Sequence, residues 1–147
     1  SAATIPVTLE STLSNGVRNS IASFAVPLCA TINLSGSMLK IVACSLAVIY
    51  TTGMDISFSQ YSAFIFTLAV AMVAAPGVPG GAIMTALAPL SAVLGFSQET
   101  NALMIALYIV MDSFGTATNV TGDGAIAVIL DKIYKNDHNL TEDETES

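Results

Sequence analysis

The chain has 147 residues, of which 53% are hydrophobic and only 10% charged, and its mean hydropathy is +0.71. Because soluble domains carry about 25% charged residues, this composition disfavours a soluble domain and is typical of a protein embedded in the lipid bilayer. The four Lys and Arg residues form no basic patch for nucleic acid, and the lack of a nucleophile–base pair, a zinc-ligand cluster and a phosphate loop argues against an enzyme.

The first part of the chain predicts a segment that continues from a longer protein, followed by a broken membrane-spanning helix. Residues 1–20 lack an initiating Met and the leader of a signal peptide, so we expect the C-terminal part of a longer protein. Residues 21–52 exceed the length of about 20 apolar residues that crosses a bilayer as a helix. The polar run from Asn33 to Ser37 interrupts this span.

Residues 57–96 predict a re-entrant helical hairpin. The apolar segments 61–75 and 82–96 are each too short to cross the bilayer comfortably. Between them lies Pro76-Gly77-Val78-Pro79-Gly80-Gly81, which cannot continue a helix because of its Pro and Gly residues. We expect two short helices joined by a tip inside the membrane.

Residues 101–133 predict a second broken membrane-spanning helix. The residues that interrupt its apolar pattern are Asp112, Gly115, Gly122, Asp123 and Gly124. A charge at membrane depth costs about 2.5–3.5 kcal/mol, so carboxylates there mark a site that binds or moves something. Broken helices are tolerated in the membrane where protein, water or ligand meets the freed backbone groups. The pattern therefore predicts a transporter, while the glycines alone also fit close helix packing.

Two other functions stay open from these residues. The same broken helices can line a pore, so a solute or anion channel is one alternative. A small membrane-anchored regulatory or assembly subunit is the other, because it fits the length of the chain as it stands.

Residues 134–147 form an acidic tail that contributes much of the formal net charge of −7. A segment with so many charges buries too little apolar area to fold, so we expect it to be disordered. Arg18, Lys132 and Lys135 flank the two predicted spans on one side. The positive-inside rule assigns that side, and with it the tail, to the cytoplasm.

Three motifs follow one another along the chain. They are Ala30-Thr31-Ile32-Asn33-Leu34-Ser35-Gly36-Ser37, Gly77-Val78-Pro79-Gly80 and Asn119-Val120-Thr121-Gly122-Asp123. In this order they resemble the dicarboxylate/amino acid:cation symporter family, which includes the glutamate-transporter homologues. The resemblance covers nearly the whole chain up to about Lys132. It implies an all-α integral membrane fold, the C-terminal half of such a transporter, in which residues 1–20 are the second arm of a first re-entrant hairpin and its connection.

The resemblance implies a plasma-membrane symporter that moves an amino acid with Na⁺ and forms a homotrimer when complete. Asp112 would bind the amino group of the substrate and Asn119 its α-carboxylate, while Thr116 lies one helical turn after Asp112 on the same face. The full implied substrate site is Ser1, Ser37, Val78, Asp112, Gly115, Thr116 and Asn119.

The resemblance also implies two sodium sites. The first would use side-chain oxygens and one backbone carbonyl, from Asn33, Asn119, Asp123 and Cys29. The second would use backbone carbonyls, from Thr31, Met72, Val73 and Ala75. Closure of the second hairpin as a lid over substrate and sodium would couple their movement.

The chain departs from the family's pattern at two positions. Acidic-substrate members carry an Arg three residues after the substrate-binding Asp, where this chain has Gly115. A second substrate carboxylate would be buried unpaired there, so a neutral amino acid is expected. A cation from outside this chain would instead keep an acidic amino acid or dicarboxylate open. The other departure is Ser35 in place of an Asp, which is expected to weaken a further sodium site.

The sequence allows two interpretations of Lys40. It lies about one helical turn beyond Ser35, so its ammonium either supplies a built-in charge for a missing sodium ion or snorkels to a water-filled cavity. Because a sodium site is expected to be weakened, protons also stay open as the coupling ion.

Overall fold

The computed structural model describes residues 2–145, with side chains described through residue 135. Every regular element in this range is a helix, so the predicted all-α class is confirmed. The elements are η1 (Ala2–Thr4), α1 (Ile5–Ser14), α2 (Asn19–Ile32), α3 (Ser35–Thr52), α4 (Phe58–Val73), α5 (Gly81–Leu94), α6 (Gln98–Val110) and α7 (Asp112–Thr145).

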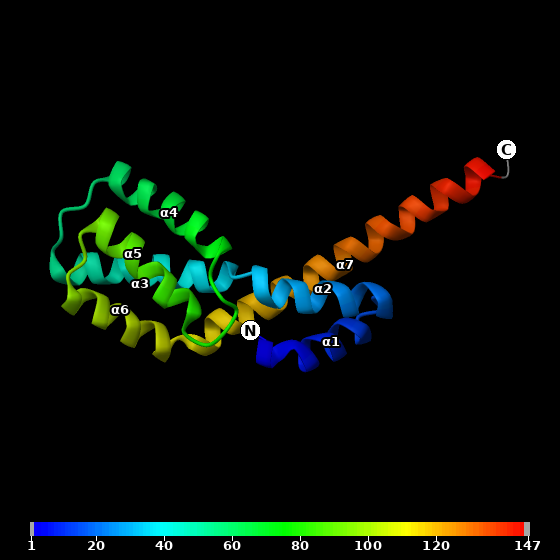
Figure 1. The fold of residues 1–147 in the computed structure, drawn as a ribbon, viewed down its shortest axis with the longest axis horizontal. Helices are drawn as coiled ribbons and strands as arrows, with labels where there is room; N and C mark the ends of the chain where they lie inside the picture. The colour runs from blue at the N-terminus through cyan, green and yellow to red at the C-terminus, as the bar shows by residue number, and fades with distance from the viewer. Residues whose placement is uncertain (1, 146–147) are drawn as a thin grey trace.

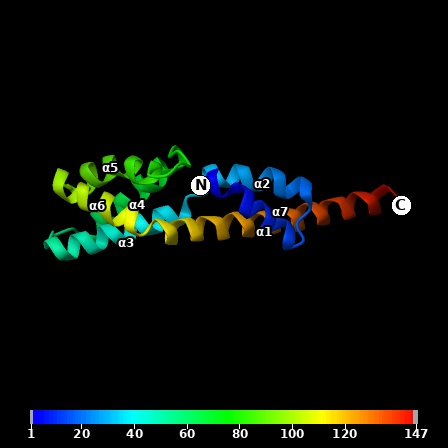
Figure 2. The ribbon, with the colours of Figure 1, turned by 90° about the horizontal axis from the view of Figure 1, so that it is seen from below.

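The helices form an elongated assembly in which each end has its own packing partners (Figure 1). At one end, α4 and α5 pair as a hairpin beside α3 and α6. At the other end, α1 and α2 pack along α7, as the view turned by 90° also shows (Figure 2). The connection between α4 and α5 points toward the middle of the molecule, where the N-terminal end also lies.

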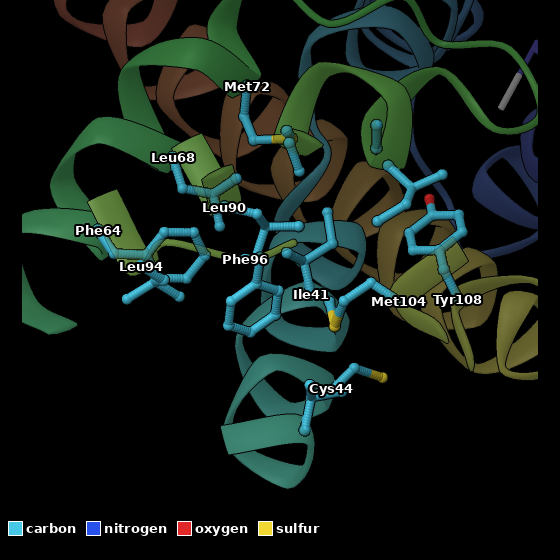
Figure 3. Packing of buried hydrophobic residues seen from close by; sticks show 14 of the residues in the cluster. Ile41, Cys44, Phe64, Leu68, Met72, Leu90, Leu94, Phe96, Met104 and Tyr108 are labelled. Atoms are coloured by element: carbon cyan, nitrogen blue, oxygen red, sulfur yellow. The ribbon is translucent and has the colours of Figure 1, made fainter. Parts of the chain in front are cut away.

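The main hydrophobic core lies between the hairpin and helices α3 and α6. Phe64, Leu68 and Met72 recur every four residues along α4, so this helix buries one continuous face. Figure 3 shows them in one cluster with Leu90 and Leu94 of α5. Because both arms contribute to this cluster, the hairpin is held against α3 and its tip is kept near the middle of the molecule.

The lengths of the helices fit a membrane protein with a re-entrant hairpin. Among the described residues, the pair α2–α3 is long and apolar enough to cross a bilayer, and the bent pair α6–α7 makes a second span if it is counted as one. Helices α4 and α5 are apolar but shorter, as expected of re-entrant arms.

The break between α2 and α3 falls at Asn33 and Leu34. Asn33 has φ −91° and ψ 93°, which is an extended conformation that ends the helical hydrogen-bond pattern. Ser35 already begins α3, so the break is narrower than the run from Asn33 to Ser37 that the sequence predicts. The freed backbone groups of this short break lie beside α7.

The second break lies beside the first of the predicted interruptions only. Helices α6 and α7 meet at Met111, next to Asp112, with a bend of 62°, whereas the later glycines and Asp123 cause no break. Instead, α7 runs through Gly115, Gly122 and Gly124 as one helix. A Cβ atom on Gly122 would lie 2.7 Å from Asn33 Nδ2, so this glycine lets α7 approach the first break closely.

The acidic tail also differs from the prediction. We expected disorder over residues 134–147, but the described backbone continues α7 as a helix to Thr145; residues 146–147 lie outside the described residues. No Gly or Pro occurs between residues 125 and 145 to end the helix. Asp131 also lies four residues before Lys135, an order of charges that stabilises a helix.

Candidate functional site

Both helix breaks and the hairpin tip converge on a small cavity of about 50 Å³. Its lining residues are Leu34, Ser37, Pro76, Gly77, Val78, Pro79, Gly80, Ala82, Tyr108, Asp112, Thr116 and Asn119. These residues come from four different segments that are far apart in the sequence: the start of α3, the hairpin tip, the end of α6 and the first half of α7. The cavity therefore depends on the tertiary packing of all four segments.

The structure brings most of the predicted substrate residues together. The members that line the cavity are Ser37, Val78, Asp112, Thr116 and Asn119. Gly115 does not line it, because its Cα faces α3, where a Cβ atom would lie 3.1 Å from Lys40 Nζ. Ser1 lies outside the described residues.

Tyr108 is a lining residue that the sequence analysis missed. It lies four residues before Asp112 and eight before Thr116, so a repeat of four residues was the signal that pointed to it. Its hydroxyl group donates a hydrogen bond to Ser37 Oγ at 3.3 Å. Tyr108 thereby ties the end of α6 to the start of α3 in the wall of the cavity.

The hairpin tip is seated on the N-terminal end of the chain and on the end of α2. The Ala2 N–H group donates to the carbonyl oxygen of Gly77 at 3.2 Å. A Cβ atom on Gly77 would lie 2.7 Å from the carbonyl oxygen of Ala30. Only a glycine at this position allows the tip to come so close to the backbone of α2.

Asn119 is buried and links α7 to the first turn of α3. Its Oδ1 atom accepts a hydrogen bond from the Gly36 N–H group at 2.8 Å, and its Nδ2 atom donates to Ser37 Oγ at 3.1 Å. Asn119 thus satisfies a helix N-terminus that has no side-chain cap of its own. Ser37 Oγ accepts from both Asn119 and Tyr108, and among the described residues its own proton has no acceptor, so it can bond a ligand.

Asp123 is almost fully buried behind this network, with 1% of its surface exposed. Its Oδ1 atom accepts a hydrogen bond from Asn33 Nδ2 at 2.9 Å, and the same Nδ2 atom donates to the carbonyl oxygen of Asn119 at 3.3 Å. The other oxygen, Oδ2, is buried without a hydrogen-bond partner among the described residues. An unpartnered buried carboxylate oxygen fits a site for a hard cation.

The remaining residues of the first predicted cation site, Cys29 and Asn119, are bonded to the residues at the first helix break. The Cys29 carbonyl oxygen accepts the Asn33 N–H group at 2.7 Å, and Asn119 Oδ1 is held by Gly36. No group of three or more His, Cys, Asp or Glu side chains gathers within the described part of the chain. The donors here are single carboxylate, amide and carbonyl oxygens, which suit sodium better than a transition metal.

The second predicted cation set is only partly assembled. Met72 and Val73 line a cavity of about 190 Å³ beside the first helix break, together with Asn33. Thr31 and Ala75 are not among the residues that line it. The hairpin tip nevertheless lies at the end of α2, because a Cβ atom on Gly77 would be only 3.0 Å from Thr31 Cα.

Lys40 lies beside the cavity and not in its wall. Its Nζ atom donates to the carbonyl oxygen of Tyr108 at 3.1 Å and to Asp112 Oδ1 at 3.4 Å. The same ammonium lies 3.4 Å from the centre of the Tyr108 ring, a distance at which a cation and an aromatic face attract each other. Neither of the two interpretations of Lys40 from the sequence includes this contact with Asp112.

Replacing Gly122 with Ala is expected to disturb the predicted cation site, whereas Gly124→Ala is the matched control two residues away. The new methyl group at position 122 would displace Asn33 Nδ2 and break its bond to Asp123. At position 124 the nearest atom, Thr12 Oγ1, is 3.8 Å away, so alanine there should stabilise the helix by about 0.5–1 kcal/mol. Sodium-dependent thermal stabilisation of the complete protein should be lost in the first variant and kept in the second.

Comparisons with known proteins give a consistent result over nearly the whole chain. The sequence profile of the Sodium:dicarboxylate symporter family matches residues 1–133. Excitatory amino acid transporter 3 of Mus musculus is 35% identical over 136 residues, which are 92% of this chain and 26% of that protein. Excitatory amino acid transporter 5 of Homo sapiens is 30% identical over 138 residues, 93% of this chain and 24% of that protein. No solved structure gives a significant match.

Proposed function

Because the chain belongs to the sodium:dicarboxylate symporter family, we propose that it supplies the substrate and cation sites of a secondary active transporter in the plasma membrane. The chain spans about a quarter of the length of the curated relatives it matches. The observation that carries the proposal is the convergence of two helix breaks and the hairpin tip on one cavity, with Asp112 in its wall and Asp123 buried behind Asn119. Transporters bind substrate and ion at such discontinuous helices.

We propose an amino acid as the substrate, bound at its two ends by different groups. Asp112 accepts the substrate's ammonium group, and the Thr116 hydroxyl lies one turn further along the same wall. The free proton of Ser37 and the second Nδ2 proton of Asn119 donate to the α-carboxylate. These donors and this acceptor lie around one cavity, which supports binding of a zwitterion.

We propose a neutral amino acid as the substrate and not an acidic one. Gly115 brings no cation into the wall, and the ammonium of Lys40 is already bonded to Asp112 and Tyr108. A second substrate carboxylate would therefore be buried without a partner.

Sodium is the proposed coupling ion, held by oxygens of Asp123 and of residues at the break between α2 and α3. The unpartnered Oδ2 atom supports this assignment, and protons are the alternative that the substitution of Ser35 keeps open. The hairpin tip touches the cavity, Ala2 and Ala30, so we propose that it opens and closes over the site as a lid.

The acidic end of α7 is proposed to face the cytoplasm. Arg18 Nε donates to Asp131 Oδ1 at 2.7 Å, so Arg18 lies at the same end of the molecule as Lys132 and Lys135. The positive-inside rule assigns this end to the cytoplasm. A homotrimer of the complete protein is proposed on the family resemblance alone, and chemical cross-linking of that protein tests it.

Uptake into proteoliposomes that contain the complete protein tests the function. We expect accumulation of labelled serine and alanine, but not aspartate, when sodium is higher outside. Asp112→Asn should lower this uptake at least 100-fold, because the ammonium loses its charged partner. A channel would equilibrate the label without concentrating it. Strong aspartate uptake would overturn the neutral substrate, and accumulation that ignores sodium would overturn sodium coupling in favour of protons.

A further inference from the structure

The Lys40 side chain brings a cation into a place where water does not reach. Only 3% of this side chain is exposed, whereas 55% of the Asp112 side chain is exposed. A buried ammonium is costly unless polar groups accept its protons. Its acceptors are the Tyr108 carbonyl oxygen and Asp112 Oδ1, supported by the Tyr108 ring. Snorkelling to water therefore does not describe this residue.

Gly115 provides the space that Lys40 occupies. A Cβ atom on Gly115 would lie 3.1 Å from both Cε and Nζ of Lys40. Such a distance is tighter than an ordinary carbon contact, so a larger residue would push the ammonium away from Asp112. A long side chain at position 115 and the present position of Lys40 exclude each other, which makes the two residues one coupled element.

Lys40 contacts Asp112 without lining the cavity. The cavity wall includes Asp112 and Tyr108 but not Lys40. The ammonium can therefore compensate the carboxylate without filling the space of a ligand. Asp112 thus contacts a resident cation and also lines the cavity.

We propose that Lys40 is the resident counter-cation of Asp112 and competes with the substrate's ammonium for this carboxylate. The proposal rests on the proposed function and makes Lys40 a positioning residue that acts through Asp112. In the empty site Lys40 already compensates the charge of Asp112. The substrate's ammonium must therefore replace Lys40 as the partner of this carboxylate. The pair weakens amino acid binding and lowers the preference of the site for ligands with an ammonium over analogues without one.

Alanine and lactate are the matched probes, because lactate has a hydroxyl group where alanine has its ammonium. We expect Lys40→Met in the complete protein to raise the ratio of alanine affinity to lactate affinity at least tenfold, as measured by titration calorimetry. The unpaired Asp112 would then attract alanine more strongly and repel lactate. Lys132→Met, which removes an exposed charge from α7, is the control and should leave the ratio unchanged. Equal weakening of both ligands in Lys40→Met would mean a merely structural role and overturn the proposal.

A double-mutant cycle tests the pair without any ligand. Asp112→Asn leaves the Lys40 ammonium buried without its carboxylate, so it should lower the melting temperature more than the double variant Lys40→Met/Asp112→Asn does. If the effects of the two substitutions on the melting temperature were additive, the proposal would be overturned. This test also applies if Lys40→Met is too unstable for a ligand titration. If the folded wild-type protein binds no amino acid while the cycle shows coupling, the proposed function fails and the ion pair stands.

Discussion

Replacing Gly36 with Ala is expected to force α3 away from α7 and to abolish transport by the complete protein. A Cβ atom at this position would lie 2.6 Å from Thr118 Cβ and closer still to the carbonyl oxygen of Gly115. Both neighbours belong to, or sit directly on, the backbone of α7, so neither can swing aside as a flexible side chain does. We expect a loss of about 3 kcal/mol, the upper end of the usual range for overpacking.

The damage should extend to the site because Gly36 is part of it. Its N–H group is bonded to Asn119 Oδ1, and the next residue, Ser37, receives the Asn119 amide. Separating the two helices breaks both bonds at once. The expected result is a lower melting temperature together with loss of substrate binding.

Gly53→Ala is the control for this prediction. Gly53 ends α3 with φ +67° and has open space around its Cα, so alanine there costs only about 1–2 kcal/mol of left-handed backbone strain. A fluorescence-based thermal-shift assay on both variants makes the comparison. Equal melting temperatures, with substrate binding retained in Gly36→Ala, would contradict the close contact between α3 and α7.

The parts of the fold that follow from local chemistry could be predicted from the sequence. The Pro and Gly residues from Pro76 to Gly81 end one helix and begin another wherever they occur, so the hairpin was predictable. The break at Asn33 also follows a local polar signal. Asp112, Thr116 and Asn119 share a helical face by spacing alone, and the cavity wall includes all three.

The parts that depend on tertiary packing could not be predicted. Met111 is a good helix former, yet the chain bends there by 62°. Helix α3 packs against both α6 and α7, but α6 also packs with the hairpin arm α5, whereas α7 continues along α2 and α1. The contact between Lys40 and Asp112 joins residues 72 positions apart. The sequence indicated that each was unusual, but the distance between them follows only from how α3 and α7 cross.

Asp123→Asn is expected to uncouple transport from sodium while leaving the fold intact. Asparagine keeps the size of the side chain and its oxygen can still accept the bond from Asn33 Nδ2 at 2.9 Å. The substitution removes the charge and puts an NH₂ group, which cannot bind a cation, in place of the unpartnered Oδ2 atom. Since a carboxylate that is 1% exposed and has one unpartnered oxygen destabilises the protein when no cation is present, the variant should be at least as stable as the wild type without sodium.

The measurement is the melting temperature of the complete protein as sodium is raised against a constant total ionic strength set with choline. A ligand that binds only the folded state adds about 2.7 kcal/mol of stability at 100 times its dissociation constant, so the wild-type protein should become steadily more stable. Asp123→Asn should show little of this gain, and sodium-driven uptake should fall at least tenfold. Asp55→Asn, which neutralises an exposed carboxylate between α3 and α4, should behave like the wild type. If sodium raised the melting temperature of Asp123→Asn as much as that of the wild type, the ion would bind elsewhere. The buried Oδ2 atom would then need a different partner, and a proton is the smallest that satisfies it.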